Sequence, residues 1–429
     1  MNNKRASKRQ TAMLKFRWET EFKETEIGEI PKDWEVHSLG EVVKDAIVGA
    51  TPLKRVNKYW INGTIPWLTN KELEYGKINF VEDTEEKVNT IALEETNLKF
   101  LPPNSLIISF TASVGKVAIN KVPITTNQQF IGFVIENMDT VRYIGYYFLI
   151  NRELIETFSG ATPFSFITKE KALQIPIILP PLPEQSRIAT VLSWFDDLIE
   201  NKKKQNEILE KTAMAIFKSW FIDFEPFKDE EFVYNEELGR EIPKGWEVKR
   251  VEEMYVLIKG KKHLLSDVFY EGYNPYLLIE TYKTGKIDFW TKENEPYVQE
   301  DDIVLVADGE SSGRVLRYQK GVLGSTLLAL KAKEETFISK HLIYLELKFY
   351  EDEIMSHRTG SAIPHLDKDY LKNFPLLLPP PSILQSFHSI VEPLFQKIIL
   401  NQKQTMTLRK IRDTLLPLLV FGKLRVEEL

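Results

Sequence analysis

Two long segments of the chain carry hydrophobic residues at steps of three and four positions, with polar residues between them. This spacing is typical of an amphipathic α-helix, which completes a turn every ~3.6 residues. The first segment follows LPPLPEQ and ends near Phe221, and the second follows LPPPSILQ and ends near Phe421. The hydrophobic positions that we expect at a helix interface are Ile188, Leu192, Phe195, Ile199, Leu209 and Ile216 in the first segment and Val391, Phe395, Ile398, Leu408 and Leu415 in the second.

We expect the two helices to pack along each other. About 37 residues at 1.5 Å per residue make a rod of roughly 55 Å, which is longer than a small domain can cover. We therefore predict an antiparallel pair, in which Asn201 and Asn401 interrupt the apolar stripes midway and fix the register. The alternative is that each helix packs against its own globular segment.

The remaining sequence consists of short apolar runs separated by turns. SLIISFTASVGKVAI (105–119) and DIVLVADGESSGRVL (302–316) each contain an apolar run, a turn of small residues, and a Gly-Lys-Val or Gly-Arg-Val that opens a second run. Runs of this kind predict β-strands. The fold class is therefore predicted to be α+β, with two pseudo-symmetric globular α/β domains separated by a long antiparallel two-helix coiled coil. The predicted boundaries are 1–21 for an N-terminal tail, 22–178 and 229–377 for the globular domains, and 179–228 and 378–429 for the helices.

The two halves of the chain repeat the same motifs in the same order. EIPKDWEV (29–36) recurs as EIPKGWEV (241–248), identical except at one position. IPWLTNKELEYGKINF (65–80) is matched by NPYLLIETYKTGKIDF (274–289), and a proline-rich entry precedes each long helical segment. Order and spacing together indicate a tandem duplication, whose period of about 200 residues is too long for a solenoid.

Composition narrows the class of protein. With 43% hydrophobic and 28% charged residues the chain reads as folded rather than disordered. No apolar run approaches the ~20 residues of a membrane span, and no apolar stretch follows the basic N-terminus as in a secretory signal. The absence of cysteine excludes disulfides and thiolate metal sites, so we expect a cytoplasmic protein. Residues 1–18 carry six basic and no acidic side chains despite a net charge of −6. This tail is interpreted as a solvated, mobile terminus or as an arm that touches nucleic acid.

Catalytic motifs are missing from the sequence. No GxGxxG and no GxxxxGK[ST] occurs, and the strings around Asn294 and Asp223 lack the Pro-Pro of amino-methyltransferases. The six histidines have no metal-ligand spacing. Asp301 and Asp302 are interpreted as a strand-entry turn. We therefore expect no catalytic residue and no bound metal.

Two similar domains on a stiff spacer suit contact with a long, regular object. Duplex DNA repeats every ~34 Å, so a rod of roughly 55 Å spans more than one turn. An antiparallel helix pair relates its two domains by an approximate two-fold axis, as the two strands of a duplex are related. Each domain would then present the same face to its own half of a DNA site.

The two copies differ at polar positions beside the shared framework. Asn and Gln pair with adenine edges, and Lys or Arg with guanine, so exchanges there would change which bases are contacted. Different domains predict an asymmetric, two-part target, whereas ordinary drift after duplication is the alternative. The sequence aligns Thr69, Asn70 and Lys71 with Leu278, Ile279 and Glu280, and Asn127, Gln128 and Gln129 with Ser325, Thr326 and Leu327.

Basic residues near the same motifs are candidates for phosphate contact, although many such clusters are only solvated faces. One cluster follows Gly-Ala-Thr-Pro in the first copy, and another occupies the corresponding part of the second. The residues predicted to bind DNA are Lys54, Arg55, Lys58, Thr69, Asn70, Lys71, Lys116, Asn127, Gln128 and Gln129 in the first copy, and Lys259, Lys261, Lys262, Tyr282, Arg314, Ser325 and Thr326 in the second.

With these motifs the chain resembles the specificity subunits of type I DNA restriction–modification systems. The resemblance is carried by the repeated EIPK motif, GATP (49–52), IPWLTNKEL (65–73), SFTASVGK (109–116), NQQF (127–130) and LPPLPEQSRIA (179–189). It covers the chain from about residue 22 to the end. The second copy departs from the pattern, because it has LIKGKKHLL in place of GATP, lacks NQQF, and has SILQ in place of PEQ.

The resemblance implies a division of labour. Each globular domain would be a target recognition domain for one half of a bipartite double-stranded DNA site. The helices would set the gap between the halves and bind modification (methyltransferase) subunits, which we expect to number two. S-adenosylmethionine, ATP and Mg would be used by the modification and restriction subunits, and this chain would hold no cofactor and catalyse nothing. The alternatives are a bivalent protein scaffold unrelated to DNA, and a restriction enzyme fragment with its own activity, which the missing motifs disfavour.

Overall fold

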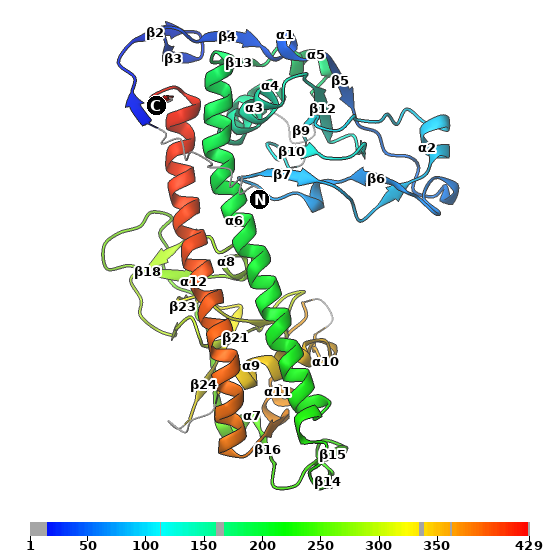
Figure 1. The fold of residues 1–429 in the computed structure, drawn as a ribbon, viewed down its shortest axis with the longest axis vertical. Helices are drawn as coiled ribbons and strands as arrows, with labels where there is room; N and C mark the ends of the chain where they lie inside the picture. The colour runs from blue at the N-terminus through cyan, green and yellow to red at the C-terminus, as the bar shows by residue number, and fades with distance from the viewer. Residues whose placement is uncertain (1–14, 112, 160–166, 334–338, 361–362, 428–429) are drawn as a thin grey trace, which may run out of the picture. The chain divides into compact units, whose positions relative to one another are not determined.

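The computed structural model describes residues 15–111, 113–159, 167–333, 339–360 and 363–427 (Figure 1). They form two compact units: unit 1 is Met1–Asp197 with Arg409–Leu429, and unit 2 is Leu198–Leu408. Each unit contains one globular segment and a part of both long helices, α6 (Leu182–Phe217) and α12 (Pro381–Val420).

Unit 1 is built on a five-stranded sheet of order β5-β12-β9-β10-β7 and a three-stranded sheet of order β11-β6-β8. Helix α3 is capped by the side chain of Asn137 and buries Tyr143 and Tyr147. Besides its parts of α6 and α12, the elements of unit 1 are β1 (Lys15–Trp18), β2 (Phe22–Thr25), β3 (Gly28–Pro31), β4 (Glu35–Ser38), α1 (Leu39–Val42), β5 (Asp45–Val48), η1 (Asn57–Tyr59), β6 (Ile65–Leu68), η2 (Asn70–Glu72), β7 (Ile78–Val81), β8 (Lys87–Val88), α2 (Thr90–Glu95), β9 (Leu106–Ser109), β10 (Val117–Asn120), β11 (Thr125–Thr126), β12 (Phe130–Val134), α3 (Met138–Ile150), α4 (Arg152–Ser159), α5 (Lys169–Leu173), β13 (Pro176–Leu179) and β26 (Leu424–Glu427).

Unit 2 has two four-stranded sheets, of order β17-β24-β21-β22 and β19-β18-β23-β20. Besides its parts of α6 and α12, its elements are η3 (Lys218–Ile222), η4 (Glu225–Phe227), β14 (Phe232–Asn235), β15 (Arg240–Pro243), β16 (Glu247–Arg250), α7 (Val251–Met254), β17 (Tyr255–Lys259), β18 (Asn274–Leu277), α8 (Ile279–Thr284), β19 (Trp290–Thr291), β20 (Tyr297–Val298), β21 (Ile303–Val306), β22 (Val315–Leu316), β23 (Gly321–Leu323), β24 (Leu327–Ala332), α9 (Lys340–Phe349), α10 (Glu351–Ser356), α11 (Lys368–Asn373) and β25 (Pro375–Leu378).

The repeat in the sequence is a repeat of structure. The strand order β5-β12-β9-β10 of unit 1 recurs as β17-β24-β21-β22 in unit 2. The parallel pair β6–β11 recurs as β18–β23, and the antiparallel pair β4–β13 as β16–β25. The predicted α+β fold with two similar α/β domains is confirmed.

The motif that occurs twice supplies a buried tryptophan in each unit. The indole Nε1 of Trp34 donates a 3.1 Å hydrogen bond to Glu184 Oε2, in the first turn of α6. Pairing of β13 with β4 and of β25 with β16 places Ile383 at the position of Glu184. Trp246 is therefore held by the rings of Phe221, Phe224 and Phe227 instead.

Hydrophobic residues near both ends of each long helix are buried in the globular cores. The core of unit 1 includes Ile188 and Leu192 from α6 together with Leu416 and Leu419 from α12. The core of unit 2 likewise takes one end of each helix, including Phe217 and Val391, Phe395 and Ile398. Packing along the partner helix and packing on a globular segment, which the sequence presents as alternatives, both occur. Of the eleven predicted interface positions, Phe195, Leu209, Ile216, Leu408 and Leu415 are only partly buried.

Within each unit α6 and α12 lie side by side and run antiparallel (Figure 1). In unit 1 Arg412 Nη1 lies 2.6 Å from Asp196 Oδ1. In unit 2 Asn401 Nδ2 donates to Asn206 Oδ1 at 2.9 Å and to Gln205 Oε1 at 3.2 Å. The prediction that Asn401 faces the opposite helix is confirmed. The prediction for Asn201 is wrong, because that side chain is exposed and accepts a hydrogen bond from Gln205 of its own helix.

Replacing Asn401 by leucine is expected to raise the free energy of unfolding by about 1 kcal/mol. Asn401 is fully buried and its Oδ1 has no hydrogen-bond partner among the described residues, so an apolar side chain removes a desolvation cost. Chemical denaturation of the full chain measures the change. Gln404→Leu, at an exposed position of α12, is the control and should have little effect.

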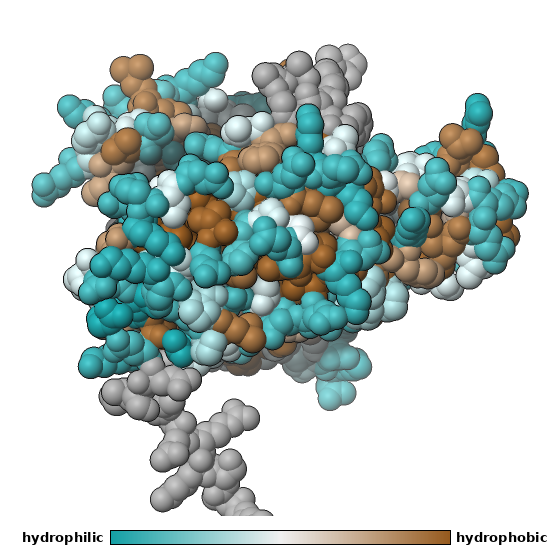
Figure 2. Space-filling view, turned by 90° about the horizontal axis from the view of Figure 1, so that it is seen from above, coloured by the Kyte–Doolittle hydropathy of each residue, from teal (hydrophilic) through white to brown (hydrophobic). Residues whose placement is uncertain are grey.

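Hydrophilic residues cover most of the face shown in Figure 2, and hydrophobic residues lie between them in small groups. Among the described helices, none combines the length and hydrophobicity needed to cross a membrane.

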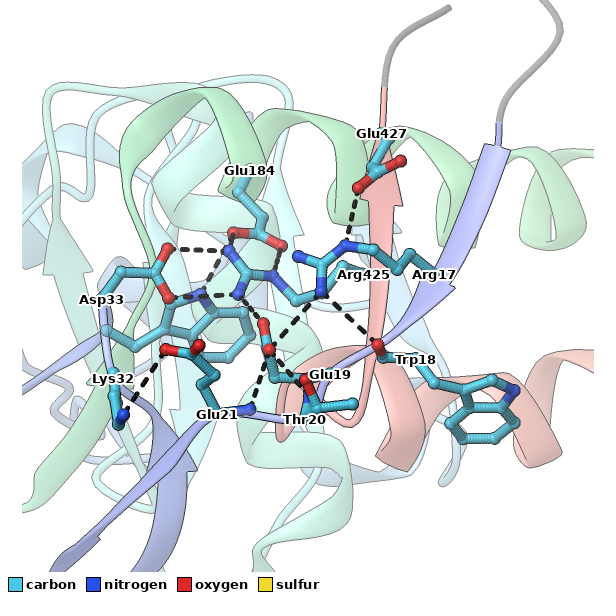
Figure 3. A network of polar contacts seen from close by, with 11 residues as sticks. Arg17, Trp18, Glu19, Thr20, Glu21, Lys32, Asp33, Glu184, Arg425 and Glu427 are labelled. Carbon is cyan, nitrogen blue, oxygen red and sulfur yellow. Dashed lines mark hydrogen bonds and ion pairs between the residues drawn. The ribbon is translucent and has the colours of Figure 1, made fainter.

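Two strands from opposite ends of the described sequence pair within unit 1. Strand β1 pairs with β26, so the expected mobile tail does not extend to residues 15–18; residues 1–14 lie outside the described part of the chain. Beside this pair the guanidinium of Arg425 contacts three carboxylates (Figure 3). Glu184 binds it through two oxygens, and Glu19 and Asp33 lie at 2.5 and 2.8 Å.

Candidate nucleic-acid interface

Four of the sequence motifs meet at one place in unit 1. The segment 127–129, which we name the contact loop of unit 1, follows β11. Asn127 N donates to Leu68 O at 3.1 Å, and Ala50 N donates to Thr126 O at 2.9 Å. A Cβ on Gly49 would lie 2.0 Å from Asn127 O, so only glycine permits this approach. The indole of Trp67 secures the other side by donating to Ala50 O at 3.0 Å.

The side chains of this loop point in different directions. Gln128 is exposed, and the Thr51 hydroxyl donates to its Oε1. Gln129 Oε1 accepts hydrogen bonds from Asn70 Nδ2 at 2.9 Å and Asn127 Nδ2 at 3.0 Å. Gln128 is therefore presented outward on a base of interlocked amides.

Two predicted contact residues support this loop from inside. Lys116 is buried, and its Nζ donates to Asn70 O at 2.6 Å. Burial lowers the pKa of Lys116. Asn70 is also buried. The structure thus places Lys116 and Asn70 beneath the surface, because an amide-rich loop needs polar partners below it.

The lysines Lys54, Lys58 and Lys71 of unit 1 lie on the surface. Lys54 pairs with Glu86 at 2.5 Å and lies 3.6 Å from the ring centroid of Trp60. Lys58 pairs with Glu95 at 2.5 Å, and Lys71 with Glu85 at 2.8 Å. Exposed pairs of this kind contribute little to stability, so a phosphate can compete for the lysines. Arg55 and Thr69 are exposed and partly buried, respectively.

Unit 2 repeats this framework with other side chains. Tyr276 replaces Trp67, and its hydroxyl donates to Lys261 O at 2.8 Å. A Cβ on Gly260 would lie 2.0 Å from Gly324 O, as Gly49 approaches Asn127. Gly324 N donates to Leu277 O at 2.9 Å, matching the bond from Asn127 to Leu68.

These hydrogen bonds correct the alignment of the two copies by one residue. The contact loop of unit 2 is 324–326, because Gly324 takes the place of Asn127. Ser325 therefore corresponds to Gln128 and Thr326 to Gln129. The sequence alone misaligned Ser325 and Thr326 because Gly324 has no side chain that would mark it as the counterpart of Asn127.

The remaining predicted residues of unit 2 differ in accessibility. Lys261, Lys262 and Arg314 are exposed, and Ser325 and Thr326 are partly exposed. Lys259 is paired with Asp308, which also contacts His365 Nδ1 at 2.8 Å. The hydroxyl of Tyr282 is buried, and burial raises its pKa. Within unit 2, Lys259 is thus held by an ion pair, and the Tyr282 hydroxyl is buried without a hydrogen-bond partner among the described residues.

One cluster with metal-ligand chemistry lies apart from these loops. Ligand atoms of His341, His388 and Glu392 lie within 4.8 Å of one another. Arg317, which is buried, donates to His341 Nδ1 at 2.9 Å. Burial and the charge of Arg317 lower the pKa of His341 to about 4. The positive charge of Arg317 beside the His341 ring disfavours a bound metal cation. We therefore interpret the cluster of His341, His388 and Glu392 as a structural one.

Comparison with known proteins identifies the family. The family model described as "Type I restriction modification DNA specificity domain" matches residues 31–211 and 243–410. The chain belongs to this family. The type I restriction enzyme MjaIX specificity subunit of Methanocaldococcus jannaschii is 41% identical over 97% of this chain and 99% of that protein. The putative MjaX specificity subunit of the same organism is 26% identical over 97% of this chain and 99% of its own.

A solved structure supports the fold assignment. The S subunit of a type I restriction–modification system from M. genitalium covers 90% of this chain and 96% of its own, with a TM-score of 0.55 and 19% identity. The two family matches divide the chain as its repeat does. Membership in a family of type I specificity subunits confirms the resemblance drawn from the motifs, and makes this chain a non-catalytic subunit.

Proposed function

We propose that this chain is the DNA-reading subunit of a type I restriction–modification enzyme, with one half of a two-part target assigned to each unit. The observation that carries the proposal is a shared loop framework with different outward residues. Gly49 in unit 1 and Gly260 in unit 2 each allow close approach to the contact loop of their own unit. The outward residue is Gln128 in the first loop and Ser325 in the second. A glutamine amide and a serine hydroxyl bind base edges differently, so the two halves would differ in sequence.

In this proposal the domains predicted from the sequence keep their roles. Residues 22–178 and 229–377 are the target recognition domains, and residues 179–228 and 378–429 form the spacer. The exposed lysines and arginines beside the contact loops bind phosphates, and the contact loops bind bases. The duplex target and the absence of cysteine in the sequence support a cytoplasmic location.

The partners supply the chemistry. Two modification subunits would bind the helix pair and use S-adenosylmethionine, and restriction subunits would use ATP and Mg. The family assignment and the duplicated architecture support this assembly, with one modification subunit for each repeat. The net charge of −6 supports a reader that depends on partner subunits for part of its phosphate contact.

A domain exchange tests the proposal. The chain is expressed with its modification subunit, and methylated bases are mapped across a genome. Exchanging residues 22–178 for the same region of a relative is expected to change one half of the motif and leave the other half and the gap unchanged. A change in both halves, or in neither, would contradict the assignment of one unit to one half. A protein scaffold unrelated to DNA would give no sequence-specific methylation at all.

A further inference from the structure

The loop 261–273 joins β17 to β18 in unit 2 and carries a dense group of exposed hydrophobic residues. Leu264 is 94% exposed, the highest value among the large hydrophobic residues described. Four other hydrophobic residues of the loop are also exposed: Leu265, Val268, Phe269 and Tyr270.

The backbone on both sides of Leu264 is anchored. Lys261 N donates to Leu323 O at 3.1 Å, and Lys261 O accepts from the Tyr276 hydroxyl. On the other side Ser266 and Trp290 exchange two backbone hydrogen bonds, of 2.9 and 2.8 Å. The exposed side chain therefore projects from a short tip between two fixed points.

The tip lies beside the contact loop of unit 2, and unit 1 has a counterpart. The backbone N–H of Lys261 donates a hydrogen bond to the carbonyl of Leu323, which immediately precedes the contact loop at 324–326. Leu264 is four residues after Gly260, and Leu53 is four residues after Gly49. Leu53 is 56% exposed, and nearby Thr51 is bonded to Gln128. The same rim of each candidate interface thus carries an exposed leucine.

Charge near the tip favours a polyanion as its partner. Lys261 and Lys262 directly precede the tip, are exposed, and make no salt bridge among the described residues. The acidic residues of the loop, Asp267 and Glu271, come after the Ser266 anchor. An apolar tip with unpaired lysines at its base fits duplex DNA, where cations meet phosphates and apolar side chains enter between bases.

We propose that Leu264 is an apolar wedge that enters the bound duplex beside the bases contacted by loop 324–326 and unstacks one base step at the half-site of unit 2, with Lys261 and Lys262 on the adjacent phosphates. The proposal rests on the proposed function. Leucine is among the side chains that proteins insert in this way, and unstacking bends the duplex toward a larger contact area. Specificity would then include the ease with which a base step deforms.

The test uses the complex with its modification subunits and the motif mapped as above. Duplexes carry 2-aminopurine at each purine of the second half-site in turn, because its fluorescence rises when the base unstacks. The wild-type complex is expected to brighten one step in addition to the methylated position. Leu264→Ala is expected to reduce that increase at least threefold, and Leu264→Phe to restore it. Val256→Ala, at a 47% exposed position of β17, is the matched control and should keep the increase.

The lysines have a separate readout. The double variant Lys261→Ala/Lys262→Ala is expected to reduce the slope of log Kd against log salt concentration by between about one and two. An unchanged slope would show that Lys261 and Lys262 do not contact phosphates.

Three outcomes distinguish the inference from the function on which it rests. An unchanged fluorescence profile for Leu264→Ala, with methylation at the same motif, would overturn the wedge and leave the reading function intact. Weaker capture of the modification subunit by that variant in the absence of DNA would assign the loop to a protein partner and also overturn the wedge. A wild-type complex that methylates no two-part motif would contradict the proposed function itself.

Discussion

Replacing Arg425 by alanine is expected to destabilise unit 1 by about 3 to 5 kcal/mol. The side chain of Arg425 is only 11% exposed, and its guanidinium contacts Glu184, Glu19 and Asp33 (Figure 3). Glu184 and Glu19 are themselves 3% and 6% exposed. Removal of the cation would leave buried Glu184 without a counter-charge and Glu19 with only Arg17, at 3.5 Å, which costs far more than the loss of a surface pair. Chemical denaturation at neutral pH measures the effect.

Arg17 provides the matched control for this substitution. It belongs to the same network and pairs with Glu427 at 2.7 Å, but its side chain is 47% exposed. Arg17→Ala is expected to cost less than about 1 kcal/mol, because water replaces its contacts. Similar losses for the two variants would show that burial of the carboxylates is not what makes Arg425 important.

The network also predicts sensitivity to acid. Burial opposes ionisation of Glu19, but hydrogen bonds from the backbone N–H groups of Glu21 and Thr20 and from Arg425 lower its pKa to about 2. A carboxyl group whose pKa is lower in the folded state stabilises the fold above its ordinary pKa of 4.5, and that contribution is lost as pH falls toward 2. Arg425→Ala is expected to reduce this loss between pH 4.5 and 2.

The sequence predicted the fold well because the signals for it were repeated. A helical period over two long segments and one motif order written twice leave few other architectures. The network of Arg425 was not predictable, since Arg425 and Glu184 are far apart in the sequence and neither occurs in a pattern that pairs them. Strand β26, which follows α12, lies beside the start of α6 and brings Arg425 to Glu184.

The accessibility of the candidate contact residues could not be predicted from the sequence, for a physical reason. The matching Gly-Lys-Val and Gly-Arg-Val turns mark Lys116 and Arg314 as equivalent cations. In the structure, however, Lys116 is buried and donates to Asn70 O, whereas Arg314 is exposed. Exposure depends on which neighbours cover a turn, which no single segment encodes. Leu264 gave no signal in the sequence either, because a leucine in a loop normally indicates burial.

Glu346 is expected to make unit 2 less stable as the pH rises from about 4.5 to 8. Its carboxyl group is buried on α9, where Oε1 accepts a 2.9 Å hydrogen bond from Leu377 N and Oε2 has no partner among the described residues. Burial raises the pKa of Glu346 to about 8, against the opposing effects of the Leu377 N–H and the charge of Arg240. The folded chain therefore keeps a proton that the unfolded chain releases above pH 4.5.

The sign follows from the order of the two pKa values. Below pH 4.5 the group is protonated in both states, and its contribution to stability is fully present. Between pH 4.5 and 8 only the unfolded state ionises, so stability falls with pH, by on the order of 4 kcal/mol in total. Above pH 8 both states ionise and the loss stops. His341, with its pKa lowered to about 4, acts in the opposite direction, but only below its ordinary pKa of 6.5.

Glu346→Gln is therefore expected to flatten the fall in unfolding free energy between pH 6.5 and 8, and to stabilise the chain at pH 8 by about 2 to 4 kcal/mol. The amide cannot ionise, yet its oxygen still accepts the bond from Leu377. Denaturation across this range, where His341 contributes no slope, isolates the effect. Glu236→Gln, at an exposed position of unit 2, removes the same charge from the surface and should leave the slope unchanged. A Glu346→Gln variant that kept the wild-type slope would mean that the carboxyl group is ionised in the folded chain, with the charge of Arg240 outweighing burial.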